Sequence, residues 1–463
     1  MSEIKTLVGS LKLEKEDFAD FRITEVESTS LVVRKGNVEQ VMHDISIGGA
    51  ARVLVNGSWG FYYTTDLSSE GIRLALEKAY KAAKALSENV IEKSKVKIER
   101  TYEDEVKLNV KIDPRSISLE EKVKVVLEFD KNIWKGNEGI ATTSVALSDS
   151  VKKEYIVNSY GTEVKYEVCS TRISGSAVAK EGDLIQNVST SVGESRGWET
   201  IKEFDYVKEG QELGKRGVEL LKALPPPSGK MNVIMDQSLV GVFIHEAFGH
   251  ASEADAVKAN RSILSGLIGK KVGDEAISVT DDPTIPGMRG SYPYDSEGTK
   301  AEKREIVRNG TLVGYLHSLE TAAYLNAKPN GAARAMNFSS KPIVRMSNTF
   351  IENGEYSLEE LAEMIKNGIY LAKSYGGYVD PARGQFYFTA QEGYLVENGK
   401  IGRKVQNVSM SGLTLDVLKN VMGVGNDLKL AFPGTCGKDG QWVPVSGGGP
   451  HIAVKEIVVG GRK

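Results

Sequence analysis

The sequence has few cysteines, no long apolar run and almost no net charge. Two cysteines among 463 residues, Cys169 and Cys436, exclude a disulfide framework and favour a reducing compartment. No apolar segment approaches the roughly 20 residues of a membrane-spanning helix, and the N-terminus lacks the apolar core of a signal peptide, so we expect a cytoplasmic protein without a membrane partner. A formal net charge of −3 gives no basic footprint for nucleic acid.

The chain does contain enough apolar residues for more than one core. With 463 residues, 40% hydrophobic and 26% charged, it is expected to form two or more domains. Residues 225–229 (PPPSG) cannot continue the helix predicted over residues 209–224, and they favour an extended spacer. We therefore predict an N-terminal domain over residues 1–225 and a C-terminal domain over residues 230–463.

Hydrophobic periodicity predicts an α+β fold in the first half of the chain. A helix is expected over residues 69–86, and another begins after Ser118, which stands in capping-box register with Glu121. Four strands broken by turns predict an antiparallel meander: residues 21–27, 30–35, 38–46 and 49–56.

The second half is predicted to be rich in strands. A short apolar strand over residues 231–235 precedes a helix that Asp236 or Ser238 can cap, and a further helix runs from Ser357 to about Lys373. The remaining predicted strands are residues 277–281, 303–307, 311–315, 386–390 and 392–397.

The most informative motif is HExxxH, formed by His245, Glu246 and His250. It is one residue longer than HExxH, in which two histidines on one helix face bind zinc and the glutamate acts as general base. The chain has only five histidines, and two of them flank a glutamate in an otherwise apolar helix. We therefore predict that both imidazoles bind one metal ion and that Glu246 takes a proton from water at that ion.

The spacing of the two histidines requires a distorted helix. Residues five apart on a regular α-helix differ in direction by about 140°, so their side chains do not share a face. A single π-type turn with i→i+5 closure brings them together, and such turns cluster at functional sites. Gly249 is a suitable place for this relaxation, and we predict the distortion between Ile244 and Ala251.

A catalytic zinc site needs a third protein ligand. The candidates are Cys436, Glu253, His317 and His451. Glu253 lies three residues beyond His250, where it suits a partner for an imidazole N–H. Cys436 lies in a glycine-rich loop that is able to present a thiolate, although a lone buried thiol is as often inert. The two remaining histidines have no feature that distinguishes them from ordinary ones.

Several segments of the second half resemble the TldD branch of the TldD/PmbA family, once described as modulators of DNA gyrase. They are HEAFGH (residues 245–250), DDPTIPGMRGSYPYDSEG (281–298), RMSNTF (345–350) and GNDLKLAFPGTCGKDGQWVPVSGGGP (425–450). The TldE or PmbA branch lacks HExxxH, so this chain resembles the catalytic partner. One departure from the family pattern is the loop VDPARG (379–384), which affects the expected substrate contacts.

The resemblance implies a ligand set, a fold and a partner. The zinc ligands are His245, His250 and Cys436, and the catalytic base is Glu246. The implied fold has a mixed α/β N-terminal domain and a largely antiparallel β C-terminal domain that carries the HExxxH helix. The family implies cleavage of unfolded peptides in an enclosed cavity, by a heterodimer with a TldE/PmbA-type subunit; a homodimer with a second copy is the alternative assembly.

Two classes of function remain. The first is a zinc metallopeptidase that hydrolyses short or unfolded peptides, and the second is a non-catalytic peptide-binding or regulatory adaptor. The intact HExxxH favours the enzyme. Because an extended peptide is able to pair with a strand edge, residues 303–307 and 386–390 are candidates for that edge.

Overall fold

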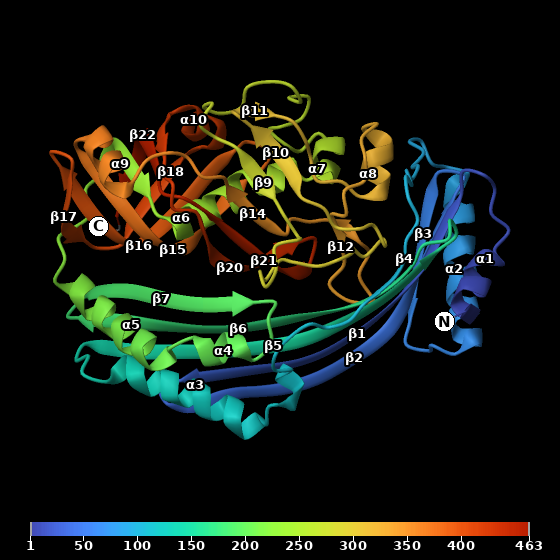
Figure 1. The fold of residues 1–463 in the computed structure, drawn as a ribbon, viewed down its shortest axis with the longest axis horizontal. Coiled ribbons are helices and arrows are strands. Elements are labelled where there is room, and N and C mark those ends of the chain that lie inside the picture. The colour runs from blue at the N-terminus through green and yellow to red at the C-terminus, as the bar shows by residue number, and fades with distance from the viewer. Residues whose placement is uncertain (1, 462–463) are drawn as a thin grey trace.

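The computed structural model describes residues 2–461 and shows an α+β protein, as predicted. A sheet of long, curved strands lies beneath a β-rich part built from the second half of the chain (Figure 1). Among the described residues, no helix is long and apolar enough to cross a membrane.

The long sheet contains four strands of 17 to 19 residues. Its order is β3-β2-β1-β5-β6, and both β4 and β7 pair with β6. The strands are β1 (Phe18–Arg34), β2 (Asn37–Val55), β3 (Ser58–Thr64), β4 (Glu103–Val106), β5 (Ile140–Asn158), β6 (Glu163–Glu181) and β7 (Leu184–Glu194).

The prediction of four short strands over residues 21–56 was wrong, because the segment forms only β1 and β2. Turns at residues 34–37 and 55–57 end these strands. The polar residues Ser28 and Thr29, which suggested a break, continue the ladder opposite Ser150 and Asp149 of β5. A polar stretch thus remains part of a strand when the strands on both sides pair with it, as β2 and β5 do here.

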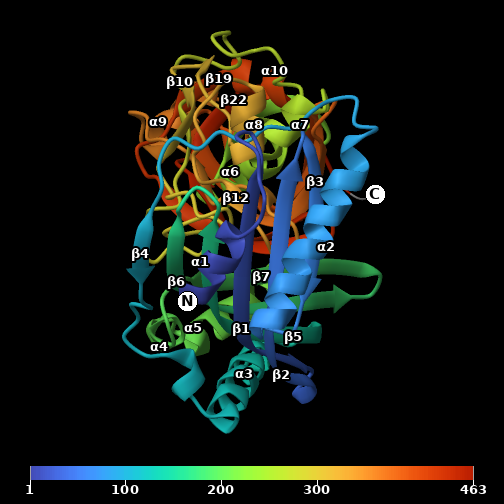
Figure 2. The same ribbon diagram turned by 90° about the vertical axis from the view of Figure 1, so that its right-hand side faces the viewer.

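Helices cover the two ends of this sheet. Ser68 caps α2 by accepting a hydrogen bond from the Gly71 amide, and Ser118 caps α3 by accepting one from the Glu121 amide. Figure 2 shows α2 lying alongside β1, β2 and β3, while α3 and α5 pack together at the other end of the sheet. The helices are α1 (Ser2–Gly9), α2 (Ser69–Ser87), η1 (Pro114–Ser116), α3 (Leu119–Trp134), α4 (Glu199–Glu203) and α5 (Tyr206–Leu221).

The β-rich part contains a closed ring of five strands. The order β15-β8-β22-β18-β16 closes on itself because β15 also pairs with β16. The strands are β8 (Gly229–Met235), β15 (Gly368–Asp380), β16 (Gln385–Glu397), β18 (Val408–Leu413) and β22 (Ile452–Gly460), with β17 (Lys400–Val405) and β19 (Val421–Val424) attached.

A second sheet of this part carries one of the predicted site residues. Its order is β11-β10-β9-β14-β21-β20, so β20 is a terminal strand. The strands are β9 (Val279–Asp281), β10 (Arg304–Arg308), β11 (Thr311–Leu312), β14 (Asn348–Ile351), β20 (Lys429–Lys438) and β21 (Gln441–Gly449), and a separate pair is β12 (Ala333–Arg334) and β13 (Ile343–Val344).

Short helices connect these strands: α6 (Gln237–Phe243), α7 (Ala254–Lys258), α8 (Leu319–Tyr324), α9 (Leu358–Ile365) and α10 (Thr414–Lys419). The prediction that the helix from Ser357 reaches Lys373 was wrong. Lys366 adopts a φ of 55°, and from Gly368 the chain forms β15, whose Ile369 and Leu371 point into the core. The helix therefore ends where the apolar period changes from helical to alternating.

The two segments proposed as free strand edges are not edges. Residues 304–307 pair with β9 and begin the pairing with β11, and residues 386–390 lie between β15 and β18. Their backbone groups are already used within the protein, so a peptide has no ladder to join there.

Candidate metal centre

The HExxxH segment begins at the end of α6. Asp236 caps this helix by accepting a hydrogen bond of 2.8 Å from the Leu239 amide. The helix then continues as a π turn over Ile244–Gly249 and a 3₁₀ turn over His250–Ser252, and the His250 amide donates to the His245 carbonyl. The predicted i→i+5 closure is thereby confirmed.

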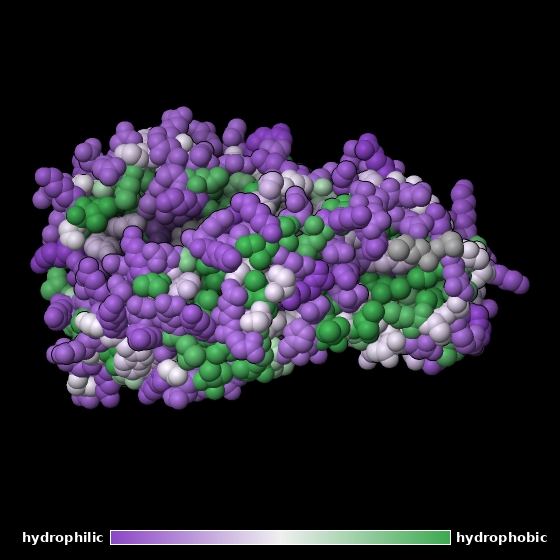
Figure 3. All heavy atoms as spheres, turned by 60° about the horizontal axis from the view of Figure 1, so that its bottom comes forward, coloured by the Kyte–Doolittle hydropathy of each residue, from purple (hydrophilic) through white to green (hydrophobic). Residues whose placement is uncertain are grey.

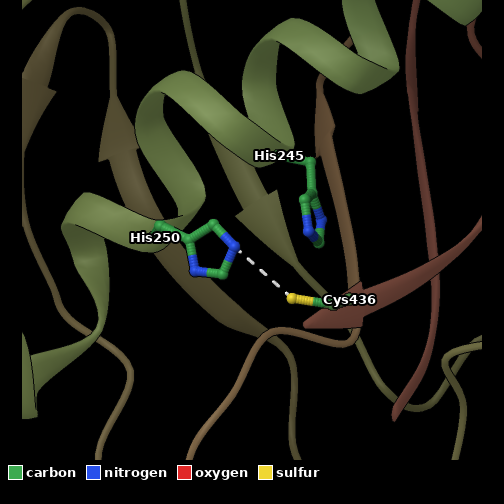
Figure 4. A group of neighbouring side chains, drawn as sticks. All are labelled: His245, His250 and Cys436. Atoms are coloured by element: carbon green, nitrogen blue, oxygen red, sulfur yellow. Dashed lines mark hydrogen bonds between the residues drawn. The ribbon is translucent and has the colours of Figure 1, made fainter. Parts of the chain in front are cut away.

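The distortion places the two histidines beside a cysteine from a distant strand. Figure 4 shows the side chains of His245, His250 and Cys436 directed toward a common space. Their candidate ligand atoms all lie within 4.8 Å of one another, and Cys436 Sγ is 3.4 Å from His250 Nε2. Three donors that converge in this way suit one tetrahedral metal ion with an open fourth position.

Electrostatics at this cluster favour the thiolate. Burial alone would raise the pKa of the Cys436 thiol, but the charges and hydrogen bonds of His245 and His250 outweigh burial and lower this pKa to about 4. The carbonyl of Cys436 accepts a hydrogen bond of 2.6 Å from Arg345. A thiolate held by an anchored backbone is the form that binds metal.

Glu253 orients one of the imidazoles. Its Oε2 lies 3.0 Å from His250 Nδ1, which leaves His250 Nε2 to face Cys436. Lys438 Nζ lies 3.1 Å from Glu253 and 2.7 Å from Asp255. Burial would raise the pKa of the Glu253 carboxyl, but Lys438 and His250 outweigh it and lower the pKa to about 2.

A cleft of about 630 Å³ opens beside the cluster. Its walls include Glu246, His250 and Lys438, together with residues 377–382 of β15 and the loop that follows it. The departure from the family pattern at residues 379–384 thus lies largely on the wall of this cleft. Glu246 is the carboxylate of HExxxH that faces this space, next to the converging donors.

The other candidate ligands lie apart from this cluster. His317 is buried against Tyr315, and burial lowers its pKa to about 4. His451 contacts Asp427 through Nδ1 at 2.6 Å and Tyr370 through Nε2 at 3.1 Å. Both histidines therefore have structural partners of their own.

The basic residues that support the centre, Lys438 and Arg345, were not predicted from the sequence. Lys438 lies two positions after Cys436, so the alternation of a strand places both side chains on one face. That spacing was a usable signal for Lys438. Arg345 lies in the quoted RMSNTF segment, but only the fold shows that its guanidinium reaches the Cys436 carbonyl.

Three family models match the chain. They are PmbA/TldA metallopeptidase domain 1 over residues 19–83, the PmbA/TldA metallopeptidase central domain over residues 112–224, and the PmbA/TldA metallopeptidase C-terminal domain over residues 228–461.

Relatives from archaea match over nearly their full length. The chain is 42% identical to a metalloprotease of Methanocaldococcus jannaschii, covering 94% of this chain and 96% of the relative. It is 32% identical to a protein of Saccharolobus solfataricus named a zinc metalloprotease TldD homolog, covering 96% of each.

Solved structures share the fold. A Thermotoga maritima protein described as a modulator of a DNA gyrase matches with a TM-score of 0.81 and 24% identity over 99% of each chain. TldE from Thermococcus kodakarensis matches with a TM-score of 0.78 and 16% identity, covering 99% of this chain and 100% of that one. At these identities the likeness concerns the fold alone.

Proposed function

Because the chain belongs to the PmbA/TldD metallopeptidase family, we propose that it is a zinc-dependent peptidase of the TldD type. The observation that carries this proposal is the convergence of His245, His250 and Cys436 beside Glu246. The adaptor alternative gives no reason for a general base next to three converging donors.

The donor set fits zinc. Two imidazoles and one thiolate are ligands that zinc accepts, and together they leave one position for water or substrate. His245 Nδ1 is buried and has no hydrogen-bond partner among residues 2–461. A buried ring nitrogen without a partner is costly unless it serves a purpose, and coordination at this ring is such a purpose.

We assign distinct roles to the residues of the centre. Bound zinc supplies Lewis acidity, which makes water more acidic and a carbonyl more electrophilic. Glu246 accepts a proton from the water that attacks the peptide carbonyl and returns it to the amine nitrogen as the C–N bond breaks. Glu253 holds the ring of His250, and Arg345 holds the backbone of Cys436.

We propose short or unfolded peptides as substrates. Peptide bonds in folded proteins are held within hydrogen-bonded elements, whereas an extended peptide is able to pair with a free strand edge and take its affinity from backbone bonds. β20 carries Cys436 and is the terminal strand of its sheet, and Gly437 and Lys438 of this strand line the cleft. Pairing of this kind gives modest sequence specificity.

The test of this function combines metal analysis with a cleavage assay on one peptide in unfolded and folded contexts. We expect cleavage of the unfolded form only, with activity lost on chelation and restored by zinc. Glu246→Gln should keep zinc and lose activity, whereas Cys436→Ala should lose both. Peptide binding without cleavage by the zinc-loaded protein would support the adaptor, and full zinc content in Cys436→Ala would disprove the ligand set.

We further propose assembly with a TldE/PmbA-type subunit or with a second copy of the chain. Among the described residues, the first half of β2 pairs only with β1, and it exposes Val38, Val41, Met42, Ile45 and Ile47. Figure 3 shows several separate apolar areas on the face that includes the lower side of Figure 1. An exposed apolar edge strand favours pairing with another chain.

The assembly proposal is tested by measuring mass in solution with and without a TldE-type subunit. We expect Met42→Lys and Ile45→Lys to weaken the complex and reduce peptidase activity. Full activity in a demonstrated monomer would contradict this proposal while leaving the zinc chemistry intact.

We also propose that residues 1–225 and 230–463 are the domains. One family model begins at residue 228, which supports the start of the C-terminal domain.

A further inference from the structure

A second cavity, of about 310 Å³, lies between the long sheet and the β-rich part. Its walls include Lys152 of β5, Tyr166 of β6, Arg289, Arg334 of β12 and Thr435 of β20. Thr435 is the strand neighbour of Cys436, and successive side chains of a strand point to opposite faces. The cavity therefore lies behind β20 relative to the metal centre.

Arg289 and Arg334 line this cavity, and Arg172 lies near Arg289 without lining it. We call Arg172, Arg289 and Arg334 the cavity arginines. The side chains of Arg172 and Arg289 both lie against Gly193 of β7. Arg289 donates to the carbonyl of Gly434 and to Thr435 Oγ. Within residues 2–461, Nε of Arg289 and Nε of Arg172 are buried without a hydrogen-bond partner.

Arg334 reaches the cavity from β12. It donates from Nη1 to the Met346 carbonyl at 2.8 Å, and its guanidinium lies 4.8 Å from the centre of the Tyr292 ring. Both Arg334 and Tyr292 line the cavity. The second terminal nitrogen of Arg334 makes no hydrogen bond to any residue in the described range 2–461.

Carboxylates do not neutralise the cavity arginines. Within residues 2–461, no carboxylate forms an ion pair with any of the three. Asp295 lines the cavity, but its oxygens accept hydrogen bonds from the amides of Glu297, Thr299 and Ala333. Lys152 adds a further positive charge, and its partner Glu154 is shared with Arg22.

The electrostatic cost of this arrangement is visible at Arg289. Burial, together with the facing charges of Arg172 and Arg334, lowers the pKa of the Arg289 guanidinium to about 9. Burial lowers the pKa of the other two cavity arginines as well. Buried cations are normally paired with an anion, and no carboxylate of the described residues forms such a pair here.

We propose that this cavity binds a small ligand bearing an oxyanion, either a phosphate or a carboxylate group, between Arg289 and Arg334. Guanidinium groups recognise both oxyanions through charge-assisted hydrogen bonds. The hydroxyls of Ser28, Ser150 and Ser170 lie on the same walls and are able to donate to further oxygens. The site is separate from the peptidase cleft.

Calorimetric titration of the zinc-loaded protein tests the proposal. The probes are inorganic phosphate, an acetylated tripeptide with a free C-terminal carboxylate, and the same tripeptide as its amide. We expect saturable binding of phosphate or of the tripeptide acid, and none of the amide. Binding of phosphate alone identifies a phosphate site, and binding of the acid identifies a peptide carboxylate.

Variants locate the binding. Arg334→Gln and Arg289→Gln should each lower the affinity for the probe about tenfold or more. A tenfold change corresponds to about 1.4 kcal/mol of binding free energy. Arg403→Gln is the matched control, because Arg403 is exposed, pairs with Glu397 and lies on β17 away from the cavity. Arg289 also donates hydrogen bonds to Gly434 and Thr435 of β20, so Arg289→Gln is at risk of not folding. In that case Arg334→Gln alone tests the site.

Three results would overturn the site. The first is no saturable binding of either anion to the wild-type protein. The second is equal affinity in Arg334→Gln and Arg403→Gln. The third is loss of binding when zinc is removed by a chelator, which would assign the anion to the metal centre.

Discussion

Outside the three candidate donors, Glu253 is the residue that contacts the candidate metal centre through the ring of His250. It is buried, and its single negative charge lies between the ring of His250 and the ammonium of Lys438. A carboxylate in this position fixes the ring and increases the basicity of the nitrogen that faces the metal.

The Glu253→Gln variant isolates that charge at nearly constant shape. We expect zinc affinity to fall about 10- to 100-fold, as is typical when the partner of a ligating histidine is lost. Competition with a chromophoric chelator measures the change, and Glu363→Gln on the surface of α9 is the control. Unaltered zinc affinity in Glu253→Gln would show that the carboxylate does not support the ring.

His317 gives a pH dependence of stability. Its pKa is lowered by burial from 6.5 to about 4 in the folded chain. Between these values the unfolded chain binds a proton and the folded chain does not, so the free energy of unfolding decreases as the pH falls through this window. Between pH 6.5 and about pH 4, His317 lowers the free energy of unfolding by about 3 kcal/mol in total. Above pH 6.5 the ring is neutral in both states and makes no contribution.

Urea unfolding at pH values from 4 to 7 measures this contribution. We expect His317→Gln to flatten the decrease, because glutamine has no proton to bind in this range. An equally steep decrease in His317→Gln would assign the pH dependence to other groups.

At the level of elements, much of the fold was predictable from local patterns. Three helices begin after a capping serine: Ser68, Ser118 and Ser357. Each serine side chain accepts a hydrogen bond from a backbone N–H in the first turn of its own helix, so the start of the helix depends on local sequence. The π turn was predictable because geometry alone forbids convergence at a spacing of five residues. The length of β1 and the end of α9 were not, because partner strands far along the chain decide them.

Gly249 is the tightest point of the π turn. A Cβ at this position would lie 2.0 Å from Met346 Sδ, and Met346 is fully buried. The Gly249→Ala variant must therefore displace either the sulfur or the turn, and we expect a loss of about 1–3 kcal/mol of stability together with weaker zinc binding.

A double-mutant cycle with Met346→Ala identifies the contact. We expect the two changes together to cost less than the sum of their separate costs, since the shorter side chain relieves the clash. Gly9→Ala is the control, because a Cβ there meets nothing within 4 Å. Strict additivity at Gly249 and Met346 would mean that the turn, and not the sulfur, limits the space.

For the whole molecule, a buried ion pair and buried hydrogen bonds join the long sheet to the β-rich part. Arg52 of β2 binds Asp20 of β1 and also donates to Glu297 at 2.8 Å. Arg22 of β1 donates to Glu154 and to the carbonyls of Asn337 and Ser340. The contact of Arg52 with Glu297 and the contacts of Arg22 with the two carbonyls connect segments more than two hundred residues apart, and no sequence pattern indicated them.

The Arg52→Met variant removes the shared cation from two buried carboxylates. We expect a loss of about 3–5 kcal/mol in the free energy of unfolding, because both carboxylates remain buried without their partner. Adding Glu297→Gln should restore part of that loss, and Arg73→Met on the exposed face of α2 should cost little. Denaturant unfolding reports all three, and equal costs for Arg52→Met and Arg73→Met would contradict the prediction.

The sequence indicated the three donors at the candidate metal centre, but it did not indicate the cavity arginines. His245 and His250 are neighbours in one motif, and the resemblance supplied Cys436. The cavity arginines come from three separate segments and have no motif that unites them. Only the packing of two sheets brings their charges together.

The closed ring of five strands also determines when the protein is able to fold during its synthesis. β8, which leads into α6 and the HExxxH segment, pairs on one side with β15 and on the other with β22. β22 spans Ile452–Gly460, so the ring is not able to close before this strand has left the ribosome. The long sheet is complete by residue 194 and is free to fold much earlier. Nascent chains are thus expected to carry a folded first half and an open second half until β22 emerges, and the candidate metal centre is completed only then.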